Sequence, residues 1–240
     1  MFNKNKVFTS YGIACVRKYN NKYELLMIQK KSSYCFIEFI RGLYDPYRYP
    51  DLSYMFDNMT IDEKSAINTM DFNIIWYKAF GRLPTSSDRS KFNKGEKKFN
   101  LLKGINDGSK LKDLIYKSSS IELLWEIPKG RMDKGETDLI SAIREFEEET
   151  NITKNNYRIL FNEGTISYTF SDNGVRYKYI YYLAVANNKL DPQYDYNNSH
   201  MISEISNIRF LSSEYIRALN NNRLYKVSKI IIKKTKNYIT

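Results

Sequence analysis

The sequence predicts an α+β protein in which an all-helical subdomain is inserted between two strands of the sheet. β-compatible segments occur near the start of the 240-residue chain and again in its second half. Apolar residues at helical spacing occupy residues 137–150. Residues 33–120 are rich in aromatic residues and also show helical spacing. We therefore expect residues 1–32 and 121–240 to form one core, with residues 33–120 as a helical insertion.

A β-hairpin is expected at the start of the chain. Tyr11–Arg17 and Tyr23–Lys31 are short β-compatible runs, and the polar residues Lys18–Lys22 lie between them. The turn is placed at Asn20 and Asn21, because asparagine favours the backbone conformations of tight turns.

The insertion is expected to contain three to five helices. Thr60 and Glu63 have the spacing of a capping box, in which two side chains satisfy backbone N–H groups at a helix start. Gly81, followed by Pro84, indicates the end of a helix. The expected helices lie near residues 51–59, 61–70, 71–80, 89–103 and 110–117.

An amphipathic helix is predicted over Thr137–Thr150. Thr137 suits the N-cap, and Asn151 suits the end of the helix because asparagine tolerates the left-handed conformation. The residues expected to face the core recur at steps of four and three: Leu139, Ile143 and Phe146. The residues expected to fall largely elsewhere on the helix are Ser141, Glu145, Glu148 and Glu149.

The second half of the chain supplies further strands and two helices. Gly164–Phe170 and Val175–Ala186 are expected to form a hairpin, because Asn173-Gly174 is a strong turn signal. The other expected elements are strands at Leu123–Ile127 and Ile205–Leu211 and helices at Ser213–Leu219 and Tyr225–Tyr238.

The chain is basic and poor in cysteine. It has 38 Lys and Arg against 27 Asp and Glu, a formal net charge of +11, which suits a polyanionic partner. Its two cysteines, Cys15 and Cys35, are too few for a disulfide framework and favour a reducing compartment. No apolar run approaches the ~18 residues of a membrane span, and the start of the chain lacks the apolar core of a signal peptide. These features predict an intracellular protein.

The most informative segment is Gly130–Ile152, GRMDKGETDLISAIREFEEETNI. Its glycine and charged residues are Gly130, Glu136, Arg144, Glu145, Glu148 and Glu149. In spacing they resemble the Nudix box, the loop–helix–loop signature of hydrolases that act on a nucleoside diphosphate linked to another group. The departure is Asn151, where the family usually has glycine, and both residues tolerate a positive φ. The resemblance implies an α/β/α sandwich with a mixed sheet.

The acidic residues of this segment predict a metal site. Glu145, Glu148 and Glu149 stand at i, i+3 and i+4, so their carboxylates share one region of a helix and repel one another. A hard divalent cation turns that repulsion into binding, and Mg²⁺ or Mn²⁺ is expected. Opposite charges on Glu136 and Arg144 are expected to fix the loop before the helix, with Glu136 as a further metal ligand. Arg144 and Glu145 are also predicted to take part in catalysis.

One further acid and the single histidine lie downstream. Glu204 opens EISNIRFLSSE, which resembles the acid-then-strand segment that follows the core hairpins in many Nudix hydrolases. In some relatives such an acid is a base or an extra metal ligand, so the resemblance implies a catalytic role; the alternative is a surface acid before a strand. His200 is expected at a surface loop position, without a catalytic role.

The layout of the chain resembles the mRNA-decapping Nudix proteins of poxviruses, asfarviruses and mimiviruses. The similarity consists of the N-terminal hairpin, the insertion and the EIPKGR sequence that leads into the box. It implies cleavage of the 5′ cap of mRNA, with release of 7-methyl-GDP and RNA bearing a 5′-monophosphate. Action in the cytoplasm of an infected host cell is implied as well, with virion association as a further expectation. The asfarvirus type also acts on diphosphoinositol polyphosphates.

A cluster of cations in the insertion is expected to bind the RNA backbone. Its members are Arg89, Lys91, Lys94, Lys97, Lys98 and Lys103. The alternative is that these residues only solvate a helix surface. A cap reader also needs aromatic planes, and Tyr168, Phe170 and Tyr177 are among the residues available to stack on a nucleobase.

Three hypotheses on function remain open from the sequence. The first is a metal-dependent hydrolase of capped mRNA. The second is a Nudix hydrolase whose main substrate is small, either an inositol pyrophosphate or a nucleotide. The third is a non-enzymatic RNA-binding protein, against which the intact set of box glutamates argues.

Overall fold

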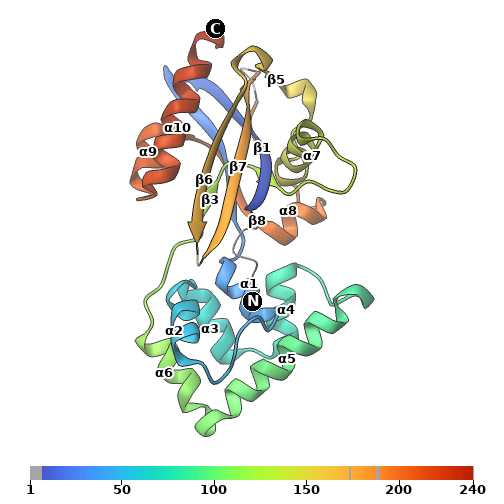
Figure 1. The fold of residues 1–240 in the computed structure, drawn as a ribbon, viewed down its shortest axis with the longest axis vertical. Helices are drawn as coiled ribbons and strands as arrows, with labels where there is room; N and C mark the ends of the chain where they lie inside the picture. Colours follow the sequence, from blue (N-terminus) through green and yellow to red (C-terminus); the bar gives the residue numbers. More distant parts are fainter. Residues whose placement is uncertain (1–6, 173, 188–189, 240) are drawn as a thin grey trace. The chain divides into compact units, whose positions relative to one another are not determined.

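The computed structural model describes residues 7–172, 174–187 and 190–239, which form two compact units (Figure 1). The sheet unit contains the described residues of Met1–Gln29, Trp125–Met201 and Ser206–Thr240. The helical unit contains Lys30–Leu124 and Ile202–Ile205. No helix in the described ranges is long and apolar enough to cross a membrane.

The sheet is built around two long central strands, β1 (Val7–Tyr19) and β7 (Val175–Ala186). They pair in parallel from Val7 opposite Arg176 to Val16 opposite Val185. Antiparallel pairs surround them, so the sheet is mixed and the α+β prediction is confirmed. The other strands are β2 (Lys22–Lys30), β3 (Trp125–Glu126), β4 (Lys129–Gly130), β5 (Tyr157–Ile159), β6 (Thr165–Asp172) and β8 (Ile205–Ser212).

Both predicted hairpins form. β1 and β2 pair antiparallel, and Asn20 and Asn21 make the turn with φ angles of 48° and 61°. β6 and β7 pair antiparallel up to Asp172 opposite Val175. Of their predicted turn, Asn173 lies outside the described residues, whereas Gly174 has φ 75°. The predicted strand at Leu123–Ile127 is shorter than expected, because β3 consists of Trp125 and Glu126 alone, which pair with Gln29 and Ile28 of β2.

Helices cover both faces of this sheet. In Figure 1, α7 (Asp138–Thr150) lies on one side, and α9 (Ser213–Ala218) with α10 (Asn222–Thr235) lies on the other. Apolar side chains of β1 and β7, such as Val16 and Leu183, are buried in one cluster with Ile216 and Ile231 of these last helices. The helix α8 (Ser199–Glu204), whose residues are divided between the two units, precedes β8.

The buried face of α7 differs from the predicted stripe. Phe146 is buried as expected, but Leu139 and Ile143 are only partly buried. The other fully buried positions of the helix are Ser141, Ala142, Glu149 and Thr150. Because α7 packs closely along β1, small side chains occupy the contact. A carboxylate can be buried beside them only because it is hydrogen-bonded there.

The helical unit contains α1 (Tyr34–Ile40), α2 (Tyr49–Asp57), α3 (Ile61–Thr69), α4 (Phe72–Phe80), α5 (Arg89–Gly104) and α6 (Ser109–Lys117). The last five match the predicted helices, whereas α1 is absent from the prediction. Both the capping box of Thr60 with Glu63 and the left-handed Gly81 are present. Aromatic side chains fill the core of this unit, including Phe39 and Trp76.

Five short 3₁₀ helices complete the described structure. They are Ser86–Asp88, Ile105–Gly108, Lys154–Asn156, Phe161–Glu163 and Lys236–Tyr238. The last of them continues α10, so the helix predicted over Tyr225–Tyr238 begins earlier, at Asn222, and changes type near its end.

Candidate active site

The two ends of α7 fix the position of the box glutamates. Thr137 accepts a hydrogen bond from the Ile140 N–H and begins α7. Asn151 ends the helix in the left-handed conformation, with φ 55° and ψ 23°, so the predicted tolerance of asparagine for this position is confirmed. Between these ends, α7 packs against β1 and β4 and carries its acidic residues toward the strand that contains Gly130.

Arg144 lies at the centre of an ionic network. Its Nε and Nη2 atoms donate to the Glu136 carboxylate at 2.7 and 3.0 Å. Its Nη1 atom donates to Glu145 at 2.9 Å and to Glu148 at 3.0 Å. Glu136 in turn accepts a hydrogen bond from the Asp133 N–H, so the loop before α7 is closed on itself. The expected link between Glu136 and Arg144 is present.

The carboxylate of Glu145 lies directly against Gly130. A Cβ atom added to Gly130 would overlap the carboxylate of Glu145, so no larger residue fits without moving this group. Burial, reinforced by the neighbouring Glu149 and Glu148, raises the pKa of Glu145 to about 7, although Arg144 acts in the opposite direction. The site thus contains a carboxylate whose negative charge is poorly compensated.

Glu149 is the most deeply buried of the three acids, with 4% of its surface exposed. Its Oε2 atom accepts a hydrogen bond of 2.8 Å from the backbone N–H of Lys129. The Lys129 ammonium is itself buried and lies 2.6 Å from Glu126. Burial alone would lower the pKa of Lys129, but Glu126, Tyr179 and Glu149 outweigh it and hold this pKa above its usual range. Lys129 therefore carries a positive charge, which acts on the carboxylates of Glu126 and Glu149.

The chemistry of these residues fits a divalent cation. Glu145 and Glu148 both accept a hydrogen bond from one cationic nitrogen, Arg144 Nη1, so the space between them already favours a positive charge. Within the described residues, no three acidic, histidine or cysteine side chains gather closely enough to form a ready metal cluster. To hold a cation together, the Glu145, Glu148 and Glu149 carboxylates would therefore have to turn toward one another, while Glu136 stays engaged by Arg144.

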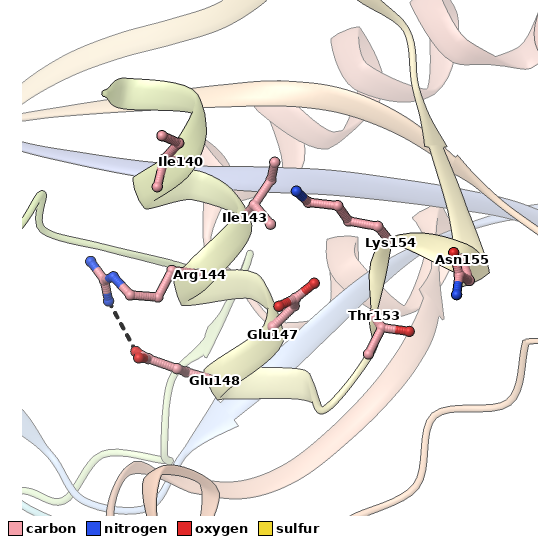
Figure 2. A pocket seen from close by; sticks show the side chains of 8 residues that line it. All are labelled: Ile140, Ile143, Arg144, Glu147, Glu148, Thr153, Lys154 and Asn155. Atoms are coloured by element: carbon pink, nitrogen blue, oxygen red, sulfur yellow. Dashed lines mark hydrogen bonds and ion pairs between the residues drawn. The ribbon is translucent and has the colours of Figure 1, made fainter. Parts of the chain in front are cut away.

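A hollow of about 540 Å³ runs along the outer side of α7 (Figure 2). Arg144 and Glu148 line it, which makes the ionic network accessible from this side. The close-up shows the Lys154 side chain extending toward Ile143, so the hollow combines an apolar wall with a cation. Its other lining residues are Ile140, Glu147, Thr153 and Asn155.

An aromatic surface lies on the face of the sheet that α10 covers in part. Phe170 and Tyr177 stand opposite each other on β6 and β7 with ring centroids 5.3 Å apart, and Phe8 of β1 lies 6.1 Å from Tyr177. The Arg223 guanidinium lies 4.1 Å from the centre of the Phe170 ring, and that of Arg131 lies 4.6 Å from the centre of Phe8. All three rings are half-buried. Arg131 directly follows Gly130, so the segment that begins the box reaches this surface, although α7 itself lies on the other side of the sheet.

Tyr168, the remaining aromatic candidate, lies further along β6. Its ring packs against the apolar core between the sheet and the helices α9 and α10. It stacks on Phe170 with ring centroids 6.0 Å apart. Tyr168 therefore lies between the apolar core and the aromatic surface, which it contacts through Phe170.

The structure separates the predicted RNA-binding cations into two groups. Arg89, Lys91, Lys94 and Lys97 are exposed along α5. Lys98 instead donates to the carbonyl oxygen of Tyr44, and Lys103 donates to that of Met70 at 3.3 Å. These two ammonium groups therefore help to hold the helical unit together.

Glu204 and His200 lie at opposite ends of α8. The Glu204 carboxylate is 3.5 Å from Lys30 Nζ, and both residues belong to the helical unit. His200 is largely exposed, as expected, although it lies in the first turn of a helix and not in a loop. Its Nδ1 atom lies 3.9 Å from Glu148 Oε2. Sequence reasoning missed this proximity, because the two residues are far apart in the chain and no spacing rule links them.

Comparison with known proteins gives a family match and several relatives. Residues 108–229 match the family model described as NUDIX domain. The chain is 36% identical over 235 residues to the mRNA-decapping protein g5R of African swine fever virus, with 93% of this chain and 91% of that protein covered. A putative mRNA-decapping protein of Acanthamoeba polyphaga mimivirus is 29% identical over 210 residues, with 78% of this chain and 58% of that protein covered. Among solved structures, a C. elegans Ap4A hydrolase in a binary complex is 18% identical, with 97% of each chain covered and a TM-score of 0.47.

Proposed function

The chain belongs to the Nudix family, and from that premise we propose that it hydrolyses the 5′ cap of mRNA, releasing 7-methyl-GDP and RNA with a 5′-monophosphate. The observation that carries the proposal is the set of box glutamates around Arg144 in a chain that matches a decapping protein along 93% of its length. We propose the cytoplasm of an infected host cell as its place of action, in keeping with its two buried cysteines, which form no disulfide.

The chemistry follows from the positions of the acids. Bound Mg²⁺ or Mn²⁺ supplies the positive charge that offsets the charge of the diphosphate as it is attacked. Glu145 accepts the proton of the attacking water on its carboxylate. Arg144 keeps Glu145 and Glu148 side by side through its Nη1 atom. Glu149 joins α7 to β4 through the Lys129 N–H, which fixes the helix relative to Gly130.

The cap base is proposed to stack on the aromatic surface of Phe8, Tyr177 and Phe170. A 7-methylguanine carries a positive charge, and aromatic faces attract such a cation. Two guanidinium groups lie on this surface, one against Phe8 and one against Phe170, so flat cations fit against its rings, and the cap base would take the place of one of these groups. The RNA backbone is proposed to follow the exposed cations of α5, which are Arg89, Lys91, Lys94 and Lys97.

A comparison of substrates tests this function against its main alternative. The purified protein is incubated with cap-labelled RNA, with free cap dinucleotide and with an inositol pyrophosphate, each with Mg²⁺ and with Mn²⁺. Decapping predicts that capped RNA is turned over faster than either small substrate. Equal or faster turnover of a small substrate would show that an inositol pyrophosphate or a nucleotide is the main substrate. Absence of hydrolysis with every substrate and both metals would favour a binding protein.

A further inference from the structure

The loop that precedes α8 is fastened to the end of α7 by the residue that departs from the Nudix pattern. Asn151 holds the left-handed turn that glycine would also hold, but its side chain adds a contact. Its Nδ2 atom donates to Asp195 Oδ2 at 3.0 Å. Asp195 Oδ1 accepts from the Asn197 N–H at 2.8 Å, which folds the loop back at this point. A glycine could form the turn but not this link to the loop.

A second asparagine joins the same loop to α7. Asn198 Nδ2 donates to the carbonyl oxygen of Glu148 at 3.2 Å. The Oδ1 atom of Asn198 accepts from the backbone N–H groups of His200 and Met201 at 2.9 and 3.1 Å, and so begins α8. His200 is therefore held in the first turn of a helix whose start is tied to the last turn of α7.

This arrangement brings the single histidine of the chain to one of the box carboxylates. His200 Nδ1 lies 3.9 Å from Glu148 Oε2, a distance that a small side-chain rotation or one bridging water spans. The imidazole can present an N–H group in its neutral form, so its contact with a carboxylate does not require a positive charge. Carboxylates that bind metals are commonly held by such an outer hydrogen bond.

We propose that His200 is a positioning residue for Glu148, and that Asn151 fastens the loop that brings His200 to it. Arg144 holds Glu148 through Nη1, and this nitrogen also serves Glu145. His200 gives Glu148 a second partner, which keeps this carboxylate oriented toward a cation shared with Glu145. The inference deepens the proposed function and rests on it in one respect, because it takes Glu148 as a metal ligand.

The first test measures Mn²⁺ affinity by titration calorimetry without substrate. His200→Ala should weaken Mn²⁺ binding about 10–100-fold, the usual effect of removing the hydrogen-bond partner of a metal ligand. His200→Asn should restore most of the affinity, because an amide nitrogen then stands near the place of Nδ1. Gln193→Ala is the control in the same loop, since Gln193 bonds to Asp191 and should leave affinity unchanged. Equal affinity of His200→Ala and wild type would overturn the proposal.

The second test examines the role of Asn151. Asn151→Gly keeps the left-handed turn and should weaken Mn²⁺ binding, but it should add no further loss to His200→Ala, because both act on the same interaction. Asn151→Asp places two carboxylates face to face and should weaken binding further. Adding Asp195→Asn to that variant restores a donor and an acceptor and should recover affinity. Two results would contradict the role of Asn151. One is that the losses of Mn²⁺ affinity in Asn151→Gly and His200→Ala add up in the double variant; the other is that Asp195→Asn does not restore the affinity of Asn151→Asp.

The outcome for His200 stays separate from the outcome for decapping. Wild-type protein that binds Mn²⁺ and does not cleave capped RNA would refute the proposed substrate, whereas the calorimetric comparison would still decide on His200. Wild-type protein that binds no Mn²⁺ would overturn the role assigned to Glu148 and His200. Thermal unfolding of each variant shows whether a loss of affinity arises from loss of the fold.

Discussion

At the scale of single residues, the lack of a side chain at Gly130 is what allows Glu145 to lie where it does. The carboxylate occupies the volume that a Cβ atom would take. The buried Glu149 is placed by a different device, a hydrogen bond from the Lys129 N–H. Contacts within the chain therefore fix the positions of Glu145 and Glu149 relative to β4.

Gly130→Ala should therefore lower turnover strongly and change the free energy of unfolding only slightly. The added Cβ would overlap the end of the Glu145 side chain, which is flexible and can move away. Turnover should fall about 100-fold, because a displacement of about 1 Å has that effect on catalysis. The free energy of unfolding, measured in urea, should change by about 0.5 kcal/mol or less.

Gly12→Ala is the matched comparison. There the added Cβ would overlap the backbone oxygen of Pro128, which cannot move freely. This variant should lose about 1–3 kcal/mol of stability. A large loss of stability in Gly130→Ala, or normal turnover, would show that Glu145 is not held as described.

Glu149 gives a second prediction at this scale. Glu149→Gln keeps an oxygen that accepts the Lys129 N–H, so the variant should fold normally and lose hydrolysis, since one ligand charge is gone. Glu149→Ala should additionally lose about 1–3 kcal/mol of stability, because a buried N–H is left without an acceptor. Turnover at saturating Mn²⁺ and urea unfolding separate the two effects. Near-normal turnover of Glu149→Gln would remove Glu149 from the metal site.

At the scale of elements, local signals predict most helices correctly. The capping box of α3, the left-handed Gly81 after α4 and the caps of α7 are all set by neighbouring residues. α1 escapes prediction because it is only seven residues long and is stabilised by its buried side chains and the Ser33 cap. The predicted stripe of α7 is confirmed for Phe146 only; Ser141 and Ala142 are buried more deeply than Leu139 and Ile143, because close packing on β1 favours small residues, which a pattern of large apolar residues does not reveal.

The helix α5 carries the prediction on RNA binding. Lys91→Ala, Lys94→Ala and Lys97→Ala together should weaken binding of long capped RNA and reduce its salt slope by about 0.7 for each phosphate that is no longer neutralised. Affinity for a free cap analogue should not change. Lys98→Ala is the comparison. The Lys98 ammonium donates to the Tyr44 carbonyl oxygen, so its removal should lower the free energy of unfolding. Unchanged RNA affinity of the triple variant across a salt series would show that these lysines only solvate the helix.

At the scale of the whole molecule, the arrangement of strands could not be predicted from local signals. β1 and β7 pair in parallel although more than half of the chain lies between them, and this pairing aligns Phe8 with Tyr177. The aromatic surface therefore arises from strands that the sequence places far apart. The box glutamates could be found because a single helix carries them, whereas the proximity of His200 to Glu148 depends on the tertiary fold.

The aromatic surface leads to a prediction at this scale. Phe170→Leu keeps an apolar side chain and removes the ring, so affinity for a free cap analogue should fall by about 1–3 kcal/mol. Mn²⁺ affinity should stay unchanged. Tyr77→Leu, at an exposed ring of α4, is the control. Fluorescence titration measures cap affinity and calorimetry measures Mn²⁺ affinity; equal cap affinity of Phe170→Leu and wild type would exclude stacking at this ring.

The most direct test of the central claim is the identification of the product released from cap-labelled RNA by wild-type protein and by Glu145→Gln. The wild type should release 7-methyl-GDP in the presence of Mg²⁺ or Mn²⁺ and leave RNA with a 5′-monophosphate. Glu145→Gln should bind the same RNA with similar affinity and react about 10²–10⁴-fold more slowly, because a general base is removed. Release of another product by the wild type, or an unchanged rate in Glu145→Gln, would contradict decapping by this site.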